Sequence, residues 1–239
     1  MPDIRVHTAL AVFGAILRQM LLAVALVANL SAMETQISAE PENLRVAADY
    51  RQAVIAAGEY ERSIRFFDGL SKRPGAGPHV FLSLGLAYID RIPAVGAFRR
   101  IALGNSATAA LTRSIELEPS DLAYLIRGLV NLHFEKGFFH RTPQGVEDLE
   151  NALRLAGGSA EASRARAYVA RIYVALGDGY WRLKNRDRAR ATWREGERKF
   201  PGNARLHLRL TAPDDMITGT IAHDLDAGVR VDTSLRELE

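Results

Sequence analysis

Apolar residues recur every three or four positions along most of the chain, with charged residues between them. The pattern holds from Glu42 to Asn203. This spacing places apolar side chains on one face of a helix and charged side chains on the other. Proline residues such as Pro119 and Pro201 end helices, because proline cannot donate a backbone hydrogen bond. The pattern predicts an all-α chain built from helical hairpins.

The segment from Tyr173 to Asn203 has the most regular spacing. Its first helix carries Leu176, Gly177 and Tyr180, and positions three and four apart on a helix share one face. The remaining spaced residues are Ala189, Trp193, Gly196 and Pro201. Small residues allow two helices to approach closely, and the large Trp193 is expected to fill the space between them.

This order of aromatic, Leu-Gly, Tyr, small, bulky and Pro residues resembles the tetratricopeptide repeat. The first-helix signature recurs at Phe81, Leu84, Gly85 and Tyr88, and the second-helix signature at Ala107, Leu111, Ser114 and Pro119. Two weaker units span residues 44–74 and 122–158. The resemblance implies an α-solenoid of about four hairpins over residues 42–203, in which stacked units bury a continuous core. A generic helical bundle is the alternative.

The resemblance also implies a concave binding face, lined by the first helix of each hairpin. Carried over by spacing, the partner-binding candidates on this face are His79, Leu82, Leu86, Ile126, Val130, His133, Arg171, Asp178 and Trp181. These residues would line a mostly apolar groove, which suits a protein or peptide partner or a hydrophobic small molecule. Lysine and asparagine are missing from these positions, which argues against a clamp for a peptide carboxylate.

Two insertions relative to the repeat length interrupt the second and third hairpins, at residues 91–105 and 135–144. Each falls between the two helices of a hairpin, so we expect two loops at the same edge of the stack. Loops on a rigid scaffold are often functional, and aromatic and arginine residues often anchor interfaces. The candidates here are Arg99, Arg100, Phe138, Phe139 and Arg141. Each phenylalanine could instead pack beneath its own loop.

The two ends of the chain differ from the repeats. Residues 9–17 and 20–30 are almost wholly apolar, which indicates a signal peptide or a membrane anchor within residues 1–32. Residues 33–41 would be a linker. We therefore expect a periplasmic or extracytoplasmic protein, either soluble after cleavage or tethered to the inner membrane. Residues 204–239 are expected to cap the solenoid, although they could dock on a partner instead.

The composition limits the classes of function that the chain can have. The chain has 31 basic and 28 acidic residues, interleaved along the sequence, which does not favour nucleic-acid binding. It has no cysteine, which excludes disulfides and thiolate sites. His133 with His140, and Glu147 with Glu150, are weak candidates for metal or acid–base chemistry, and Asp148 is expected on a solvated face. We expect no enzyme activity, no metal and no cofactor.

The predicted function is an exported scaffold or adaptor that binds a protein partner through its concave face and its insertions. Assembly or maturation of an envelope complex is the setting that this combination favours. The alternative is a periplasmic accessory protein that binds a small ligand for a solute transport system.

Overall fold

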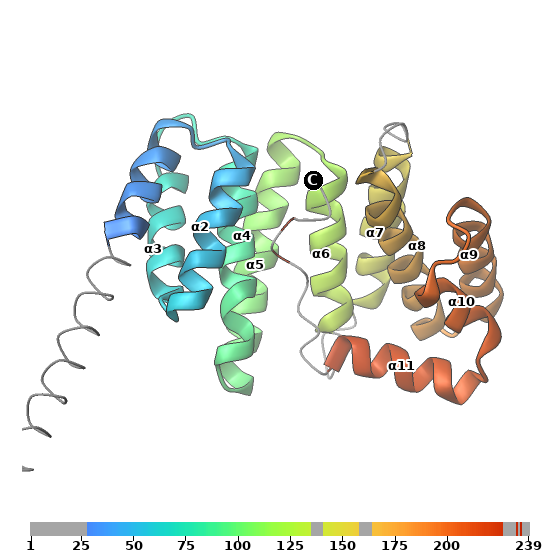
Figure 1. Ribbon diagram of the computed structural model, residues 1–239. Coiled ribbons are helices and arrows are strands. Elements are labelled where there is room, and N and C mark those ends of the chain that lie inside the picture. The colour runs from blue at the N-terminus through green and yellow to red at the C-terminus, as the bar shows by residue number, and fades with distance from the viewer. Residues whose placement is uncertain (1–27, 135–140, 158–163, 227–232, 234, 236–239) are drawn as a thin grey trace, which may run out of the picture.

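The chain is a row of helical hairpins in the computed structural model, which describes residues 28–134, 141–157, 164–226, 233 and 235 (Figure 1). These residues contain helices and no strand. The hairpin helices are α2 (Leu44–Ala57), α3 (Tyr60–Ser71), α4 (Pro78–Arg91), α5 (Ala97–Leu117), α6 (Asp121–His133), α7 (Thr142–Ala156), α8 (Arg164–Arg182) and α9 (Arg186–Lys199). They are followed by α10 (Ala204–Thr211) and α11 (Asp214–Asp226). The expected all-α solenoid of four hairpins is confirmed.

Side-chain caps fix where several helices begin. The carboxamide oxygen of Asn43 accepts from the backbone N–H of Val46, and the hydroxyl of Ser120 does the same for Ala123. Each cap satisfies a backbone donor that the first helical turn leaves without a partner. At the other end of α2, Gly58 has a φ of 71°, a left-handed conformation that suits glycine and lets the chain turn into α3.

A glycine in the first helix allows the second helix of the hairpin to pack against it. A Cβ atom on Gly177 would lie 2.1 Å from the indole nitrogen of Trp193, so only glycine leaves room for this side chain. Trp193 is fully buried. The same contact recurs in two other hairpins, between Gly85 and Leu111 and between Gly128 and Leu149. The signature glycines of the sequence are therefore sites of close helix approach.

The hairpins pack in sequence order, α3 against α4, α5 against α6 and α7 against α8. Their buried apolar residues form one continuous core that extends from Leu30 to Ile221. Stacking therefore buries surface that a single hairpin would leave exposed to water.

The chain before α2 differs from the expected linker. Residues 28–39 are helical, and Leu30 and Ile37 are fully buried. The carboxylate of Glu34 accepts from the hydroxyl of Tyr50 at 2.6 Å and from Nε of Arg62 at 2.7 Å. The hydrogen bond from Arg62 lowers the pKa of Glu34. Residues 33–39 are thus part of the packed structure, because their apolar residues face the first hairpin.

The expected signal peptide or anchor lies mostly outside the described residues and stays a prediction. Within residues 28–134, 141–157 and 164–226, no helix is both long and apolar enough to cross a membrane.

The close approach at Gly177 can be tested by comparing two glycine-to-alanine substitutions. Gly177→Ala should lower the free energy of unfolding by about 1–3 kcal/mol, because the new methyl group overlaps the ring of Trp193. Gly69→Ala is the matched control, since its Cβ meets no atom within 4 Å. Alanine favours a helix, so Gly69→Ala should raise stability by about 0.5–1 kcal/mol. Urea unfolding of both variants measures the two values, and equal effects would contradict the packing described here.

Candidate functional site

The first helices of the hairpins, α2, α4, α6 and α8, form one side of the array, which we call the inner face. Four candidates expected to line an open apolar groove there are buried: Leu82, Leu86, Ile126 and Val130 are each 2% exposed or less. They belong to the hydrophobic core. In this structure their side chains are inaccessible to a partner, so the groove expected from the sequence is not open at these positions.

Three further candidates on these helices are partly exposed. His79 lies in the first turn of α4, where its backbone N–H donates to Glu42 Oε2 at 2.9 Å. His133 ends α6, and its ring packs edge-on against Phe134. Because α4 and α6 run in the same direction, these histidines lie at opposite edges of the array (Figure 1). Arg171 lies midway along α8 and is also partly exposed. The structure does not bring the three together.

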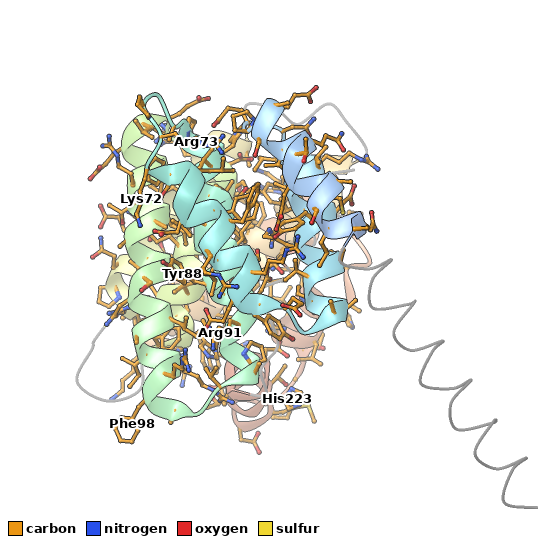
Figure 2. The ribbon with its side chains drawn as sticks, turned by 90° about the vertical axis from the view of Figure 1, so that its left-hand side faces the viewer. Lys72, Arg73, Tyr88, Arg91, Phe98 and His223 are labelled. Atoms are coloured by element: carbon orange, nitrogen blue, oxygen red, sulfur yellow. The ribbon has the colours of Figure 1, made fainter. Side chains whose placement is uncertain are left out.

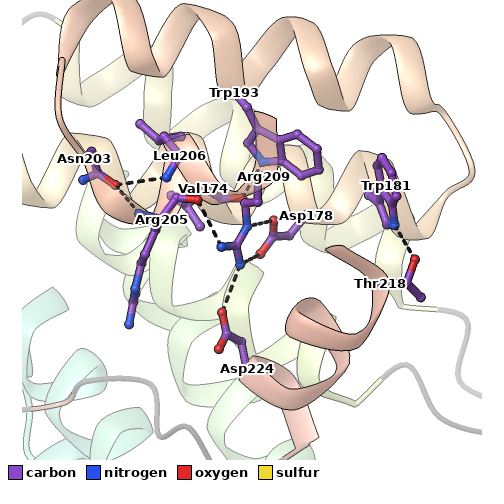
Figure 3. A network of polar contacts seen from close by, with 10 residues as sticks. All are labelled: Val174, Asp178, Trp181, Trp193, Asn203, Arg205, Leu206, Arg209, Thr218 and Asp224. Atoms are coloured by element: carbon purple, nitrogen blue, oxygen red, sulfur yellow. Dashed lines mark hydrogen bonds and ion pairs between the residues drawn. The ribbon is translucent and has the colours of Figure 1, made fainter. Parts of the chain in front are cut away.

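Asp178, another candidate, is occupied by a buried ion pair (Figure 3). Nε and Nη2 of Arg209 in α10 donate to its two oxygens at 2.5 and 2.6 Å. Arg209 Nη2 also donates to Asp224 of α11 at 2.9 Å. Burial raises the pKa of Asp178, and the guanidinium of Arg209 opposes that shift. This network holds α10 and α11 against α8.

Trp181 is also covered by the chain's own C-terminal part. Only 3% of Trp181 is exposed, and its indole N–H donates to Thr218 Oγ1 of α11 at 3.0 Å (Figure 3). Ile217 and Ile221 of α11 are buried, so this helix contributes its apolar face to the core. α10 and α11 therefore close the fourth hairpin, as expected for a capping segment.

A third contact places Thr233 against the first two hairpins. Nη2 of Arg51 in α2 donates to the backbone oxygen of Thr233 at 2.5 Å. The hydroxyl of Thr233 donates to Asp90 of α4, and Arg51 Nη1 donates to the same carboxylate at 3.0 Å. Thr233 is 8% exposed and Leu235 packs against the core. Thr233 thus contacts the first two hairpins, whereas α10 and α11 contact the fourth.

The spacing of residues in the sequence does not predict the buried contacts of Arg51, Asp90, Arg209 and Thr233. The sequence position of Arg51 indicates that it is buried. It lies four residues after Ala47 and three before Val54, on the apolar face of its helix. A charged residue in that position needs a buried partner. Which carboxylate supplies it depends on how distant segments meet, so the sequence alone does not show it.

The first insertion is not a loop. After a short 3-10 turn (Ile92–Ala94), the chain enters α5 at Ala97, so the extra residues lengthen this helix to 21 residues. Alanine, leucine and arginine favour the helix there. Phe134 packs on Gly104, where a Cβ atom would lie 2.5 Å from its ring, and so fixes the extension against α6. The lower end of α5 projects beyond the neighbouring helices (Figure 1).

The start of α5, from Phe98 to Ile101, is here called the α5 projection. Phe98 is 94% exposed and points away from the other helices (Figure 2). Nη2 of Arg99 lies 3.1 Å from Oε1 of Glu61, a carboxylate that also pairs with Arg91. Nε of Arg100 donates to a backbone oxygen of the preceding turn at 2.9 Å. The Glu61 carboxylate is thus shared by Arg91 and Arg99. The net charge around the exposed ring of Phe98 is therefore positive.

The second insertion meets the first. Nη2 of Arg141 donates to Asn105 Oδ1 of α5 at 2.6 Å. This contact places Arg141 beside α5, at the last residue of the first insertion. Phe138, Phe139 and His140 lie outside the described residues, so their part in a site stays a prediction.

Two acidic residues near the candidates for metal or acid–base chemistry are used in structural contacts. Asp148, expected on a solvated face, is 1% exposed and accepts from Nε and Nη2 of Arg127 at 3.0 and 2.6 Å. Its neighbour Glu150 accepts from the hydroxyl of Tyr180. In the part of the chain that the structure describes, no three histidine or acidic residues are grouped so as to hold a metal ion.

Comparison with solved structures supports the fold. TTC0263, described as a thermophilic tetratricopeptide repeat protein of Thermus thermophilus, superposes with a TM-score of 0.54 over 81% of this chain and 93% of its own. The MamA protein superposes with a TM-score of 0.52 over 76% of this chain and 86% of its own. Both are 17% identical to this chain in sequence. The chain therefore has the tetratricopeptide-repeat fold. No protein-family model matches the sequence, and no curated protein does.

The Arg209 network predicts non-additive effects on stability. Arg209→Met should lower the free energy of unfolding by about 3–5 kcal/mol, because it leaves the Asp178 carboxylate buried without its partner. Adding Asp178→Leu removes the second buried charge and should restore at least half of that loss. Urea unfolding of the two single variants and the double variant measures the coupling. Losses that simply add would show that the two side chains act independently.

Proposed function

We propose that this protein is a scaffold that binds a protein partner at the α5 projection. The fold supports this proposal, because stacked helical hairpins offer an extended, rigid surface on which partners can bind. The observation that carries it is the exposure of Phe98, 94%, at the end of a packed helix. Large aromatic residues and arginine are the residue types that most often dominate binding energy at interfaces.

The projection is held in place before any partner binds. Phe134 packs on Gly104, and Arg141 is hydrogen-bonded to Asn105, so the base of the extension is fixed from two sides. A fixed helix loses little conformational freedom on binding, which favours affinity. The partner that fits is a protein with an apolar pocket for Phe98, bordered by carboxylates that complement Arg99 and Arg100.

The cellular setting is proposed from the sequence. The apolar runs within residues 9–30 support export or a membrane tether, and assembly or maturation of an envelope complex is the role that we propose for the scaffold. The alternative of a small-ligand accessory protein gains no support from the inner face, since the apolar residues expected to line its groove are buried.

A photo-reactive amino acid at position 98 tests this surface directly. In native cells, a photo-crosslinker replacing Phe98 should give one discrete protein adduct, identified by mass spectrometry. The same crosslinker replacing Met216, an apolar residue of α11 that is 56% exposed, is the matched control and should not give that adduct. Arg99→Glu with Arg100→Glu should abolish the adduct from position 98, because carboxylates would then face carboxylates.

With the identified partner purified, Phe98→Ser should weaken binding at least about tenfold, because burying phenylalanine contributes about 1.5–3 kcal/mol. The free energy of unfolding should change by less than about 0.5 kcal/mol, since the side chain is exposed. Equal adducts at positions 98 and 216, or unchanged binding by Phe98→Ser, would exclude the projection as the binding surface.

A further inference from the structure

The helix α11 is built around residues that disfavour a helix. The run from Ile217 to Ile221 reads Ile-Thr-Gly-Thr-Ile. β-branched residues and glycine are less favourable than alanine inside a helix, because of the side-chain or backbone freedom that they lose there. In addition, an isolated helix of 13 residues is only marginally stable in water. Contacts with the rest of the chain therefore hold α11 in its helical form.

The apolar contacts of α11 lie along one side of the helix. Ile217 and Ile221 are four residues apart, so they share a face, and they are 0% and 2% exposed. Next to this face, Oγ1 of Thr218 accepts the indole N–H of Trp181 in α8 at 3.0 Å (Figure 3). On the other side of α11, Met216 is 56% exposed. The helix therefore lies on the surface of the fourth hairpin and buries a single apolar stripe.

A carboxylate lies at each end of this stripe. Asp214, three residues before the first isoleucine, pairs with Arg190 of α9 at 2.6 Å. Asp224, three residues after the second isoleucine, pairs with Arg209 of α10 at 2.9 Å. The side chains of the two carboxylates are 62% and 31% exposed, so water reaches both. An apolar stripe with charged ends, bound by complementary groups, is the usual form in which a groove recognises a helix.

The residues that contact α11 keep other partners if the helix leaves. Arg209 donates with Nε and Nη2 to the two oxygens of Asp178, so its guanidinium would still have a buried carboxylate beside it. The ring of Trp181 lies 3.4 Å from the guanidinium carbon of Arg186, and 5.5 Å from the ring of Trp193. Release of α11 therefore leaves no buried charge unpaired at Arg209, and the fourth hairpin can stay folded without it.

We propose that Trp181, Arg190 and Arg209 form a docking site for an amphipathic helix of a partner protein, and that α11 is the resident occupant of this site. The partner helix carries a carboxylate, an apolar residue three positions later, a second apolar residue four positions after that, and a carboxylate three positions further. Because α11 is helical only while it is docked, a partner helix of the same pattern with stronger helix formers displaces it without better contacts. The site shares no residue with the α5 projection.

Gly219 allows the docked state to be changed without changing a contact. A Cβ atom on Gly219 would meet no described atom within 4 Å, so Gly219→Ala alters only the tendency to form a helix. This substitution should favour the docked state about four- to fivefold. Gly219→Pro removes a backbone donor in the middle of the helix and should release α11.

Amide hydrogen exchange of the full chain measures the release. The amides of residues 217–221 should exchange through a local opening, while those of α8 and α9 stay protected. Gly219→Ala should raise the protection of the α11 amides about four- to fivefold and leave α8 and α9 unchanged. Exchange of α11 only together with α8 and α9, at the rate of global unfolding, would show that α11 is an integral part of the fold and would overturn the proposal.

Binding is measured with a fluorescein-labelled peptide of residues 213–224 that carries Gly219→Ala, titrated into the full chain and followed by fluorescence anisotropy. A tethered segment acts at an effective concentration of roughly millimolar, so the wild-type chain should bind the peptide weakly. The Gly219→Pro chain should bind it at least about tenfold more tightly, and the Gly219→Ala chain about four- to fivefold more weakly than the wild type. A peptide with Ile217→Ser and Ile221→Ser is the matched control and should not bind.

A charge reversal tests whether the peptide occupies the position of α11. Adding Arg190→Glu to the Gly219→Pro chain should weaken binding at least about threefold, because Asp214 of the peptide would then face a carboxylate. A peptide with Asp214→Arg should recover that loss. Equal binding by the wild-type and Gly219→Pro chains, or equal binding of the control peptide, would exclude the docking site. Failure of the crosslinking at position 98 would leave these outcomes unaffected.

Discussion

The structure depends on how closely the two helices of each hairpin approach. Where Gly177 meets Trp193, the absence of a Cβ atom leaves the space that the indole fills. Leucine takes the same role opposite Gly85 and Gly128. A fixed spacing within each hairpin gives every hairpin a similar shape, and similar units can stack in a row. The continuous core and the extended surfaces both follow from this one contact.

Buried charges serve a second purpose, which is to join distant segments. Arg209 connects α8 to α10 and α11, and Arg51 connects α2 and α4 to Thr233. A buried guanidinium must be paired with hydrogen-bond acceptors. Each of these arginines can therefore pack only against a segment that supplies suitable oxygen atoms. Specific polar contacts therefore join distant segments near both the first and the last hairpin, in addition to apolar burial.

Two groups of charged residues differ in their exposure to solvent. The α5 projection is exposed, positively charged and held from its base, so it can meet a partner without rearrangement. Arg51 and Asp90 are instead buried, and both are hydrogen-bonded to Thr233.

The sequence by itself determined the helices, the glycine contacts and the stacked arrangement, because these depend on spacing within about 30 to 40 residues. It also predicted that Arg99, Arg100 and Arg141 lie at one edge. It did not show that residues 91–105 continue a helix, because the packing of Phe134 on Gly104 decides that. Only the tertiary structure showed that Leu82 and Val130 are buried, and that Asp178 is paired with Arg209. These features arise where segments far apart in the sequence meet, and local spacing carries no information about which distant residue supplies a buried partner.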